Sequence, residues 1–327
     1  MKIGEKKISR WISTIRFDWV EVLFSSEEEQ DADSKVVEAR MIAVMGITGN
    51  VGGEVAKNLL AAGRTVRAVV RDEQKGDPWK RNGCEVAVAD IHNAESLKKA
   101  FAGAEGVFVM APPVFDPKPG FPEAGSMAAA VRAALEAARP GRVVYLSTIG
   151  AQSSRENLLT QHTIIEKELK GARATITFLR PGWFMENCSW DVAPAREKGV
   201  VPSFLQPLDK AFPMVATEDI GRVAAELIGE AWTGVRVVEL EGPRRVSPND
   251  VAAAFSKLLG KPVQMELVRH EKWEKMFRAQ GMTNPMPRIQ MLDGFNEGWI
   301  DFESGAAGTR KGKVELETVL KKLIEGK

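Results

Sequence analysis

The chain has 327 residues, 44% of them apolar, which is enough for one large domain or a domain with a smaller lobe. Its 45 Lys and Arg residues balance 44 Asp and Glu residues, so overall charge gives no reason to expect binding to nucleic acid or to an anionic membrane. The two cysteines and three histidines are scattered. We therefore expect no disulfide framework, no metal site and a cytoplasmic location.

Residues 1–40 are expected to be a leader that precedes the folded domain. Residues 1–24 mix Lys and Arg with apolar side chains, and residues 25–35 form an acidic linker. A secretory signal would need a continuous apolar stretch and a small-residue cleavage site, and neither is clear here. We expect a poorly ordered leader or a short amphipathic helix. Nowhere in the chain does an apolar run reach the roughly 18 residues that a membrane span needs.

From residue 41 onward, short apolar strands alternate with helices. The expected strands are Met41–Met45, Thr65–Val70, Glu85–Ala89, Gly106–Met110, Arg142–Leu146 and Thr175–Leu179. The expected helices between and after them are Glu54–Ala62, Ala94–Phe101, Ser126–Ala138 and Gln161–Lys170. This alternation predicts an α/β fold with a doubly wound parallel sheet, as in Rossmann domains. We assign residues 41–190 to that domain.

After Pro181 the alternation loosens, and residues 191–327 are expected to form a smaller C-terminal lobe that is partly interleaved with the sheet. Asp219 is expected to cap a helix that ends at Gly229, and Ser247 a helix with Pro248 in its first turn. A strand at Arg236–Leu240 and the segments Val263–Val268 and Trp273–Ala279 complete this lobe. Such a lobe would cover the carboxyl ends of the strands, where open α/β sheets bind their ligands.

A glycine motif, Gly46-Ile-Thr-Gly49-Asn-Val-Gly52, stands between the first expected strand and the first helix. Glycines at Gly46, Gly49 and Gly52 permit a tight turn and let the main chain approach a pyrophosphate. The free N–H groups of the helix N-terminus then bind the phosphate oxygens. In this strand–loop–helix context, the motif predicts a bound nicotinamide dinucleotide.

Two side chains bear on which dinucleotide is bound. Arg71 follows the second strand, where Rossmann domains contact the adenosine ribose, and an arginine there can pair with a 2′-phosphate. It favours NADP(H) over NAD, although the neighbouring Asp72 weakens this signal. Asp90, after the third strand, could accept a hydrogen bond from the adenine amino group or close the turn before Asn93.

The glycine motif, the Arg71-Asp72 pair, His162–Leu169 (HTIIEKEL) and Leu179–Asn187 (LRPGWFMEN) resemble the NmrA-like family of atypical short-chain dehydrogenases/reductases. The likeness runs from about residue 41 to 261 and is strongest to its NAD(P)H:quinone oxidoreductase members. The resemblance implies that Thr48, Asn50 and Val51 belong to the pyrophosphate loop. It also implies nicotinamide-side contacts from Met110, Ala111, Pro112, Pro113, Pro181 and Phe184.

The chain lacks the Tyr-x-x-x-Lys pair that provides the proton donor in typical short-chain dehydrogenases. Its single tyrosine, Tyr145, is followed four residues later by Ile149. If His162 occupies the position of the lysine, Leu158 occupies that of the tyrosine. If Lys167 occupies the position of the lysine, Thr163 occupies that of the tyrosine. We therefore expect an NADPH-dependent oxidoreductase for quinones or similar small electron acceptors. A non-catalytic NADP(H) sensor that acts through a protein partner is the alternative, and a homodimer stays open.

Three polar side chains are candidate catalytic residues. Ser147 and Thr148, at the end of the fifth strand, could bond a substrate oxygen or a carboxamide, or else satisfy local backbone groups. His162 could contact the substrate or the cofactor ribose, or be structural. The aromatic side chains of Trp183, Phe184 and Trp190 could form a flat wall for an aromatic substrate or belong to the core.

Overall fold

The computed structural model describes residues 41–326, so the leader inferred for residues 1–40 lies outside the described part of the chain. The described residues include no helix long and apolar enough to span a membrane.

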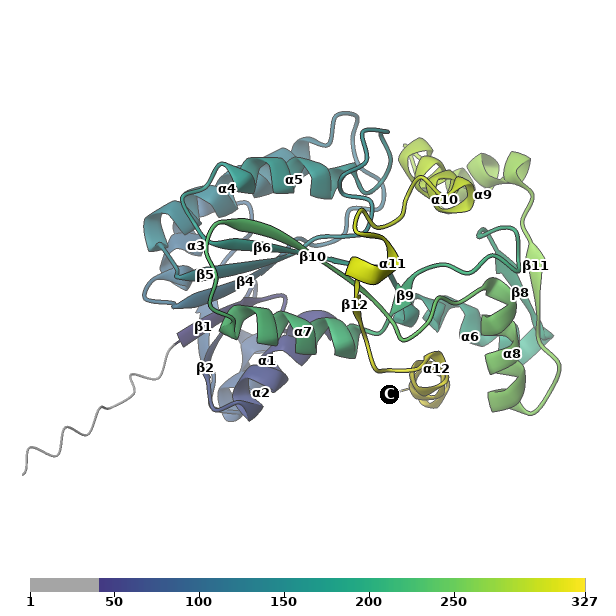
Figure 1. Cartoon of the computed structure of the whole chain (residues 1–327), viewed down its shortest axis with the longest axis horizontal. Helices are drawn as coiled ribbons and strands as arrows, with labels where there is room; N and C mark the ends of the chain where they lie inside the picture. The colour runs from purple at the N-terminus through teal and green to yellow at the C-terminus, as the bar shows by residue number, and fades with distance from the viewer. Residues whose placement is uncertain (1–40, 327) are drawn as a thin grey trace, which may run out of the picture. The chain divides into compact units, whose positions relative to one another are not determined.

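An eight-stranded sheet, parallel throughout, is the centre of the fold (Figure 1). In spatial order its strands are β3 (Glu85–Val88), β2 (Thr65–Val70), β1 (Met41–Met45), β4 (Gly106–Met110), β5 (Arg142–Leu146), β6 (Ile176–Pro181), β10 (Val235–Glu241) and β12 (Arg310–Lys311). The order 3-2-1-4-5-6 is that of a Rossmann domain, and the expected fold class is confirmed. The sequence predicted β1, β2, β4 and β5 to the residue.

Helices cover both faces of the sheet (Figure 1). On one face α3 (Ala94–Phe101), α4 (Pro122–Ala138) and α5 (Thr160–Lys170) bury their apolar sides against the strands. On the other face α1 (Asn50–Ala61) and α7 (Thr217–Gly229) do so. The short elements η1 (Glu73–Gly76) and α2 (Asp77–Arg81) join β2 to β3. Because both faces are covered, the central strands are buried and mostly apolar.

Three details of the expected helices are wrong. The first helix begins at Asn50, not Glu54, so the last residues of the glycine motif form its first turn. Helix α4 begins at Pro122, not Ser126. Asp219 does not cap α7, since the cap residue is Ala216. The Asp219 carboxylate lies within the first turn instead and accepts hydrogen bonds from the backbone N–H groups of Lys313 and Val314. A buried acid that binds a distant backbone segment has the same sequence signature as a cap.

The C-terminal half contributes to the sheet and builds a separate lobe (Figure 1). Helix α7 and strands β10 and β12, which lie beyond residue 190, complete the sheet layers. Around the lobe's two apolar clusters lie η2 (Met185–Asp191), α6 (Val192–Lys198), β8 (Val200–Ser203), α8 (Pro248–Leu259), β11 (Gln264–Leu267), η3 (His270–Lys272), α9 (Trp273–Ala279), α10 (Met286–Glu297), α11 (Gly305–Gly308) and α12 (Leu316–Glu325). A small parallel pair, β7 (Trp183–Phe184) and β9 (Met214–Val215), links this lobe to the sheet. Ser247 caps α8 as expected, in a capping box with Asp250.

Candidate functional site

The glycine loop brings its backbone close to the start of α1. Gly46 has φ +64°, a conformation that glycine adopts without strain. A Cβ on Gly52 would lie 2.3 Å from the carbonyl oxygen of Gly46, so the turn closes only with glycine there. Gly49 differs, because a Cβ there would meet only that same oxygen, at 3.4 Å. The space in front of Gly49 is therefore open.

The same loop offers backbone donors at the start of α1, although the N–H of Gly49 itself is bonded to the carbonyl oxygen of Gly46 at 2.9 Å. The N-cap residue of α1 is Gly49, which has no side chain to cap the helix. The N–H groups of the first turn have no partners within a helix, and they lie at its positive end. Thr48, Gly49 and Asn50 are exposed there. This donor set fits a pyrophosphate, since it supplies hydrogen bonds and leaves room for the ligand.

Arg71 and Asp90 follow β2 and β3 respectively. Arg71 is exposed and has no hydrogen-bond or ion-pair partner within residues 41–326. The neighbouring Asp72 is occupied, since its carboxylate accepts from the backbone N–H of Gln74. Asp90 accepts from the backbone N–H of His92 at 2.8 Å, so its turn-closing contact is formed. The free guanidinium is thus the group available to a 2′-phosphate at this edge.

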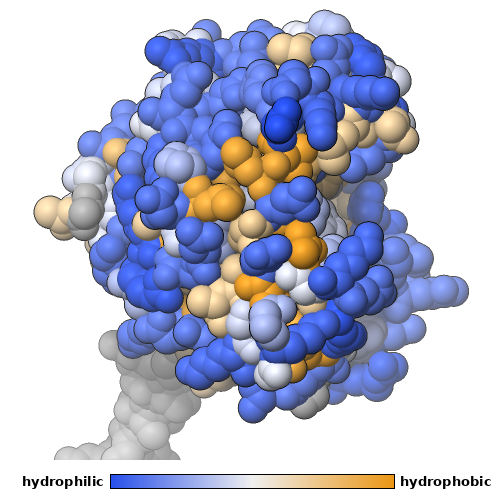
Figure 2. Space-filling model, turned by 90° about the vertical axis from the view of Figure 1, so that its right-hand side faces the viewer, coloured by the Kyte–Doolittle hydropathy of each residue, from blue (hydrophilic) through white to orange (hydrophobic). Residues whose placement is uncertain are grey.

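A pocket of about 800 Å³ opens at the carboxyl ends of β4, β5 and β6. Residues that directly follow these strands line it, and the C-terminal lobe closes it from the other side. Most of the lining is apolar or aromatic. Figure 2 shows hydrophobic side chains gathered in a central band on the lobe's end of the molecule, with hydrophilic ones above and below. This is the composition of a site for a flat apolar ligand.

The pocket gathers some of the candidate residues and leaves out others. It is lined by Ala111, Pro112, Pro113, Thr148, His162 and Phe184. Ser147 is buried outside this lining and donates its hydroxyl to Glu166 at 2.6 Å. Pro181 is buried at the end of β6, where its carbonyl accepts from the N–H of Ile149. Met110 packs beneath Gly46, and its sulfur would lie 2.1 Å from a Cβ on that glycine.

His162 is held by the only tyrosine of the chain. The Tyr145 hydroxyl lies 2.8 Å from Nδ1 of His162, and Tyr145 is wholly buried. Burial raises the pKa of Tyr145 well above its ordinary value, so the phenol keeps its proton. The hydroxyl has no other hydrogen-bond partner among residues 41–326, so it donates that proton to Nδ1. Nδ1 is then the acceptor, which leaves the proton of a neutral imidazole on Nε2.

His162 itself is a neutral imidazole at pH 7. Burial lowers its pKa to about 4, and the nearby Glu166 carboxylate opposes this shift. Nε2 has no hydrogen-bond partner among the described residues, and the side chain lines the pocket. His162 therefore presents an N–H donor to a ligand in the pocket and has no imidazolium proton to give.

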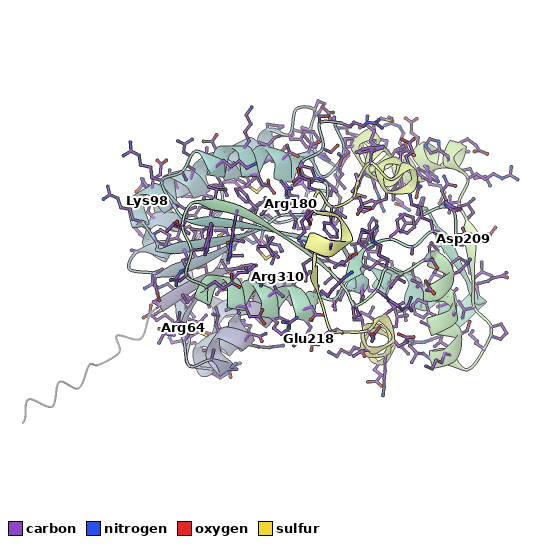
Figure 3. All side chains as sticks on the ribbon, viewed as in Figure 1. Arg64, Lys98, Arg180, Asp209, Glu218 and Arg310 are labelled. Carbon is purple, nitrogen blue, oxygen red and sulfur yellow. The ribbon has the colours of Figure 1, made fainter. Side chains whose placement is uncertain are left out.

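A buried ion pair supports the helix that carries His162. Glu166, one turn further along α5, forms two hydrogen bonds with the guanidinium of Arg180 at 2.8 and 2.7 Å. Arg180 lies in the interior, on β6, whereas Lys98 extends outward from α3 (Figure 3). Arg180 also pairs with Glu303, which precedes β12. Sequence reasoning missed this network, although Glu166 follows His162 by four residues and so shares its helix face.

The aromatic residues proposed as a wall divide into two groups. Trp183 and Phe184 line the pocket half-buried, and Trp183 packs edge-on against Phe295 with ring centroids 5.3 Å apart. Trp190 also lines the pocket but is 63% exposed, as is Phe115 at 51%. These two large apolar side chains therefore lie where the pocket meets solvent.

The sequence did not predict three further side chains of the lining, those of Cys188, Asp191 and Arg288. Asp191 lies beside Cys188, and burial raises the pKa of its carboxyl to about 7, against a smaller opposing effect of the Cys188 hydrogen bond. Arg288, on α10, lines the pocket from the lobe. No sequence signal marks these residues, because their segments have no recognisable motif. Within residues 41–326, no cluster of His, Cys, Asp and Glu side chains is arranged to hold a metal ion.

The family model that describes the NmrA-like family matches residues 38–301. This chain belongs to the NmrA-like family. The match spans the glycine loop, the pocket and α10, and it confirms the resemblance found in the sequence.

Among curated relatives, an NAD(P)H azoreductase of Xenophilus azovorans is 28% identical over 79% of this chain and 85% of its own length. Quinone oxidoreductase 2 of Escherichia coli K12 is 26% identical over 87% of this chain and 93% of its own. A solved structure of an NADPH-dependent quinone oxidoreductase from Escherichia coli aligns with a TM-score of 0.71 at 23% identity, covering 86% of this chain and 99% of that one. The solved structure shares its fold with this chain, and each of the three matches covers 79% or more of this chain.

Proposed function

We propose that this protein is an NADPH-dependent oxidoreductase that reduces quinones or similar small electron acceptors. The observation that carries the proposal is the apolar pocket with the His162 imidazole in its wall, at the strand ends next to the open glycine loop. Two relatives of this chain, an azoreductase and a quinone oxidoreductase, support the same chemistry.

The donors of the glycine loop and Arg71 would hold the pyrophosphate and the 2′-phosphate of NADPH. Residues Ala111, Pro112 and Pro113, together with Phe184, would border its nicotinamide end, because they line the pocket at the ends of β4 and β6. When bound there, NADPH supplies a hydride to the acceptor. Pocket and cofactor site would then meet at the carboxyl ends of the strands, as in other open α/β sheets.

The residues of the pocket orient an acceptor and provide a hydrogen bond to it. Aromatic side chains such as Trp183 and Phe184 exclude water and hold a flat ring. The Nε2–H of His162 can donate to a carbonyl oxygen of the acceptor or to a group of the cofactor. Neither His162, with a pKa of about 4, nor the buried Tyr145 is a proton donor at pH 7.

Asp191, whose carboxyl has a pKa of about 7, lines the pocket from η2 beside Cys188. The residues at the strand ends therefore supply no acid of their own, and this favours one substrate class. A ketone that accepts a hydride becomes an alkoxide, a strong base that needs a positioned acid. A quinone becomes a hydroquinone monoanion, whose charge is spread over the ring and which can take its proton from water. General-acid catalysis typically contributes about 10²–10⁴-fold, so its loss disfavours ketones far more than quinones.

The test is to mix the purified protein with NADPH and a panel of quinones and unactivated ketones, and to follow the absorbance of NADPH. We expect quinone-dependent oxidation and little or no oxidation with ketones. Tight NADPH binding without any turnover would overturn the proposal in favour of an NADP(H) sensor. Efficient ketone turnover would contradict the mechanism, and Asp191, the lining carboxyl with a pKa of about 7, would then be the acid to test.

The cytoplasm is the location we propose for this activity. Both cysteines, Cys84 and Cys188, are free and buried, and NADPH-dependent reduction suits a reducing compartment.

A further inference from the structure

Arg288 is a charged side chain in an otherwise mostly apolar pocket. It lies near the start of α10, is half-buried, and lines the cavity. Within residues 41–326 its guanidinium forms no ion pair. Its polar contact is the sulfur of Met282 at 3.8 Å, and its other contact is the ring face of Phe277, 4.3 Å from the guanidinium carbon to the ring centroid.

Other arginines in similar positions are paired with acids. Arg180 binds Glu166 and Glu303, Arg222 binds Asp219 and Glu226, and Arg245 binds Glu241 and Asp301. Burying a charged side chain away from water costs free energy unless an oppositely charged partner compensates it. Among residues 41–326 Arg288 has no acidic partner, and apart from the N–H that points at the Met282 sulfur its donors are left for something else.

The charges that surround Arg288 favour an anion. Of the other titratable side chains in the lining, His162 is neutral and Cys188 is a thiol whose pKa burial raises well above its ordinary value. The Asp191 carboxyl, with a pKa of about 7, is only partly ionised at neutral pH. Two further acids are engaged elsewhere: Asp116, in the loop after β4, accepts from Thr283 and Asn284, and Asp293 on α10 pairs with His270.

We propose that Arg288 binds an anionic substituent, a carboxylate or sulfonate, on an aromatic acceptor whose ring occupies the apolar part of the pocket. The planar guanidinium matches such an oxyanion with two parallel N–H donors, and the stacking on Phe277 holds it in one orientation. This inference rests on the proposed reductase function, and it specifies the class of acceptor.

The test compares 1,4-naphthoquinone-2-sulfonate with uncharged 1,4-naphthoquinone as acceptors for NADPH. Arg288→Met retains the apolar stem and removes the charge. It should lower the ratio of the two kcat/KM values, sulfonated over uncharged, by about 10- to 100-fold, chiefly through KM, as expected for loss of a charge-assisted hydrogen bond. Arg288→Lys should recover part of the ratio. Arg278→Met, which removes an exposed and ion-paired arginine of α9, should leave the ratio unchanged.

An unchanged ratio in Arg288→Met, or the same loss in Arg278→Met, would overturn the inference. A second readout does not depend on turnover: naphthalene-2-sulfonate, which accepts no electrons, is titrated by the quenching of tryptophan fluorescence. The wild-type protein should bind it at least ten-fold more tightly than Arg288→Met. If neither quinone is reduced but this difference is found, the reductase proposal fails and the anion site stands; equal binding overturns the anion site.

Discussion

The Tyr145 hydroxyl lies 2.8 Å from Nδ1 of His162, and this contact sets which nitrogen of the ring faces the pocket with a proton. Without the hydroxyl, neither tautomer is favoured by the protein. With its proton on Nδ1, His162 would present a hydrogen-bond acceptor to the pocket, whereas the carbonyl oxygen of a quinone needs a hydrogen-bond donor. The buried tyrosine thus acts on the pocket through the imidazole, without touching a ligand.

We expect Tyr145→Phe to raise KM for NADPH about two- to ten-fold, with a smaller fall in kcat, and to lower the free energy of unfolding by about 1 kcal/mol, the usual worth of a neutral hydrogen bond. The decisive measurement is the double variant with His162→Gln. Because a glutamine has no tautomer to set, Tyr145→Phe should have little effect on KM for NADPH in that background. Equal effects in both backgrounds would mean that the tyrosine acts through packing alone.

Replacing His162 by alanine should loosen the cofactor more than it slows the chemistry. The side chain lines the pocket near the loops that would border the nicotinamide ribose, and it holds no proton that the reaction uses at pH 7. We expect KM for NADPH to rise by a larger factor than kcat falls, measured at saturating quinone. A fall in kcat with KM unchanged would give His162 a role in the transition state instead.

The lowered pKa of His162 makes acid stability a further test. Between its ordinary pKa of 6.5 and its folded value of about 4, the unfolded chain binds a proton that the folded protein does not. The free energy of unfolding should therefore fall as the pH drops from 6.5 towards 4, by on the order of 2 kcal/mol from this group. His162→Gln should lose correspondingly less stability between pH 7 and pH 4.5 in urea titrations. The exposed His92→Gln is the matched control and should behave as wild type.

Two glycines of the loop should respond differently to substitution. Gly49→Val adds a side chain to an open space at an ordinary backbone conformation, φ −100° and ψ 176°. It should abolish NADPH binding, measured by fluorescence, with the thermal midpoint unchanged. Gly52→Val forces a side chain into the backbone of Gly46, so binding and stability should both fall. Gly125→Val, on the exposed side of α4, controls for the substitution itself. Wild-type affinity in Gly49→Val would disprove the loop assignment.

Arg71→Asp should shift the preference from NADPH toward NADH. A charge-assisted contact to a phosphate is worth about 1.5–3 kcal/mol, so affinity for NADPH should fall by roughly one to two decades. NADH affinity should change far less. Arg81→Asp makes the same change of charge on the exposed end of α2, and its NADPH/NADH ratio should match the wild type. A ratio unchanged in Arg71→Asp would mean that Arg71 does not meet the 2′-phosphate.

The Rossmann half could be predicted from the sequence because each of its strands is a short apolar run with a helix on either side. Helix α10 could not, since Pro285 and Pro287 stand at its start and its apolar residues have no amphipathic period. It is stabilised by tertiary packing of residues such as Leu292 and Phe295. Helix α12 does show a clear apolar face, formed by Leu316, Val319 and Leu320, so its pattern can be recognised in the sequence.

The candidate site likewise has a part that could be predicted from the sequence and a part that could not. The cofactor loop is a local motif, contiguous in the sequence, and could be found there. Arg288 reaches the pocket from about 140 residues beyond Thr148, and the Arg180–Glu166 pair joins a strand to a helix. Such side chains are brought together only by the fold, and no pattern of residue types along the chain indicates their meeting.

The order in which the strands enter the sheet bears on synthesis of the chain. Strand β6 is complete at Pro181, but its outer neighbour β10 begins only at Val235. A nascent chain that stops between them has an apolar strand, buried along its whole length in the finished protein, as an unpaired sheet edge. Such an edge invites pairing with other chains. A gene truncated after the Rossmann motifs should therefore yield aggregates instead of a small cofactor-binding domain, because the last strands to be made protect the ones made before them.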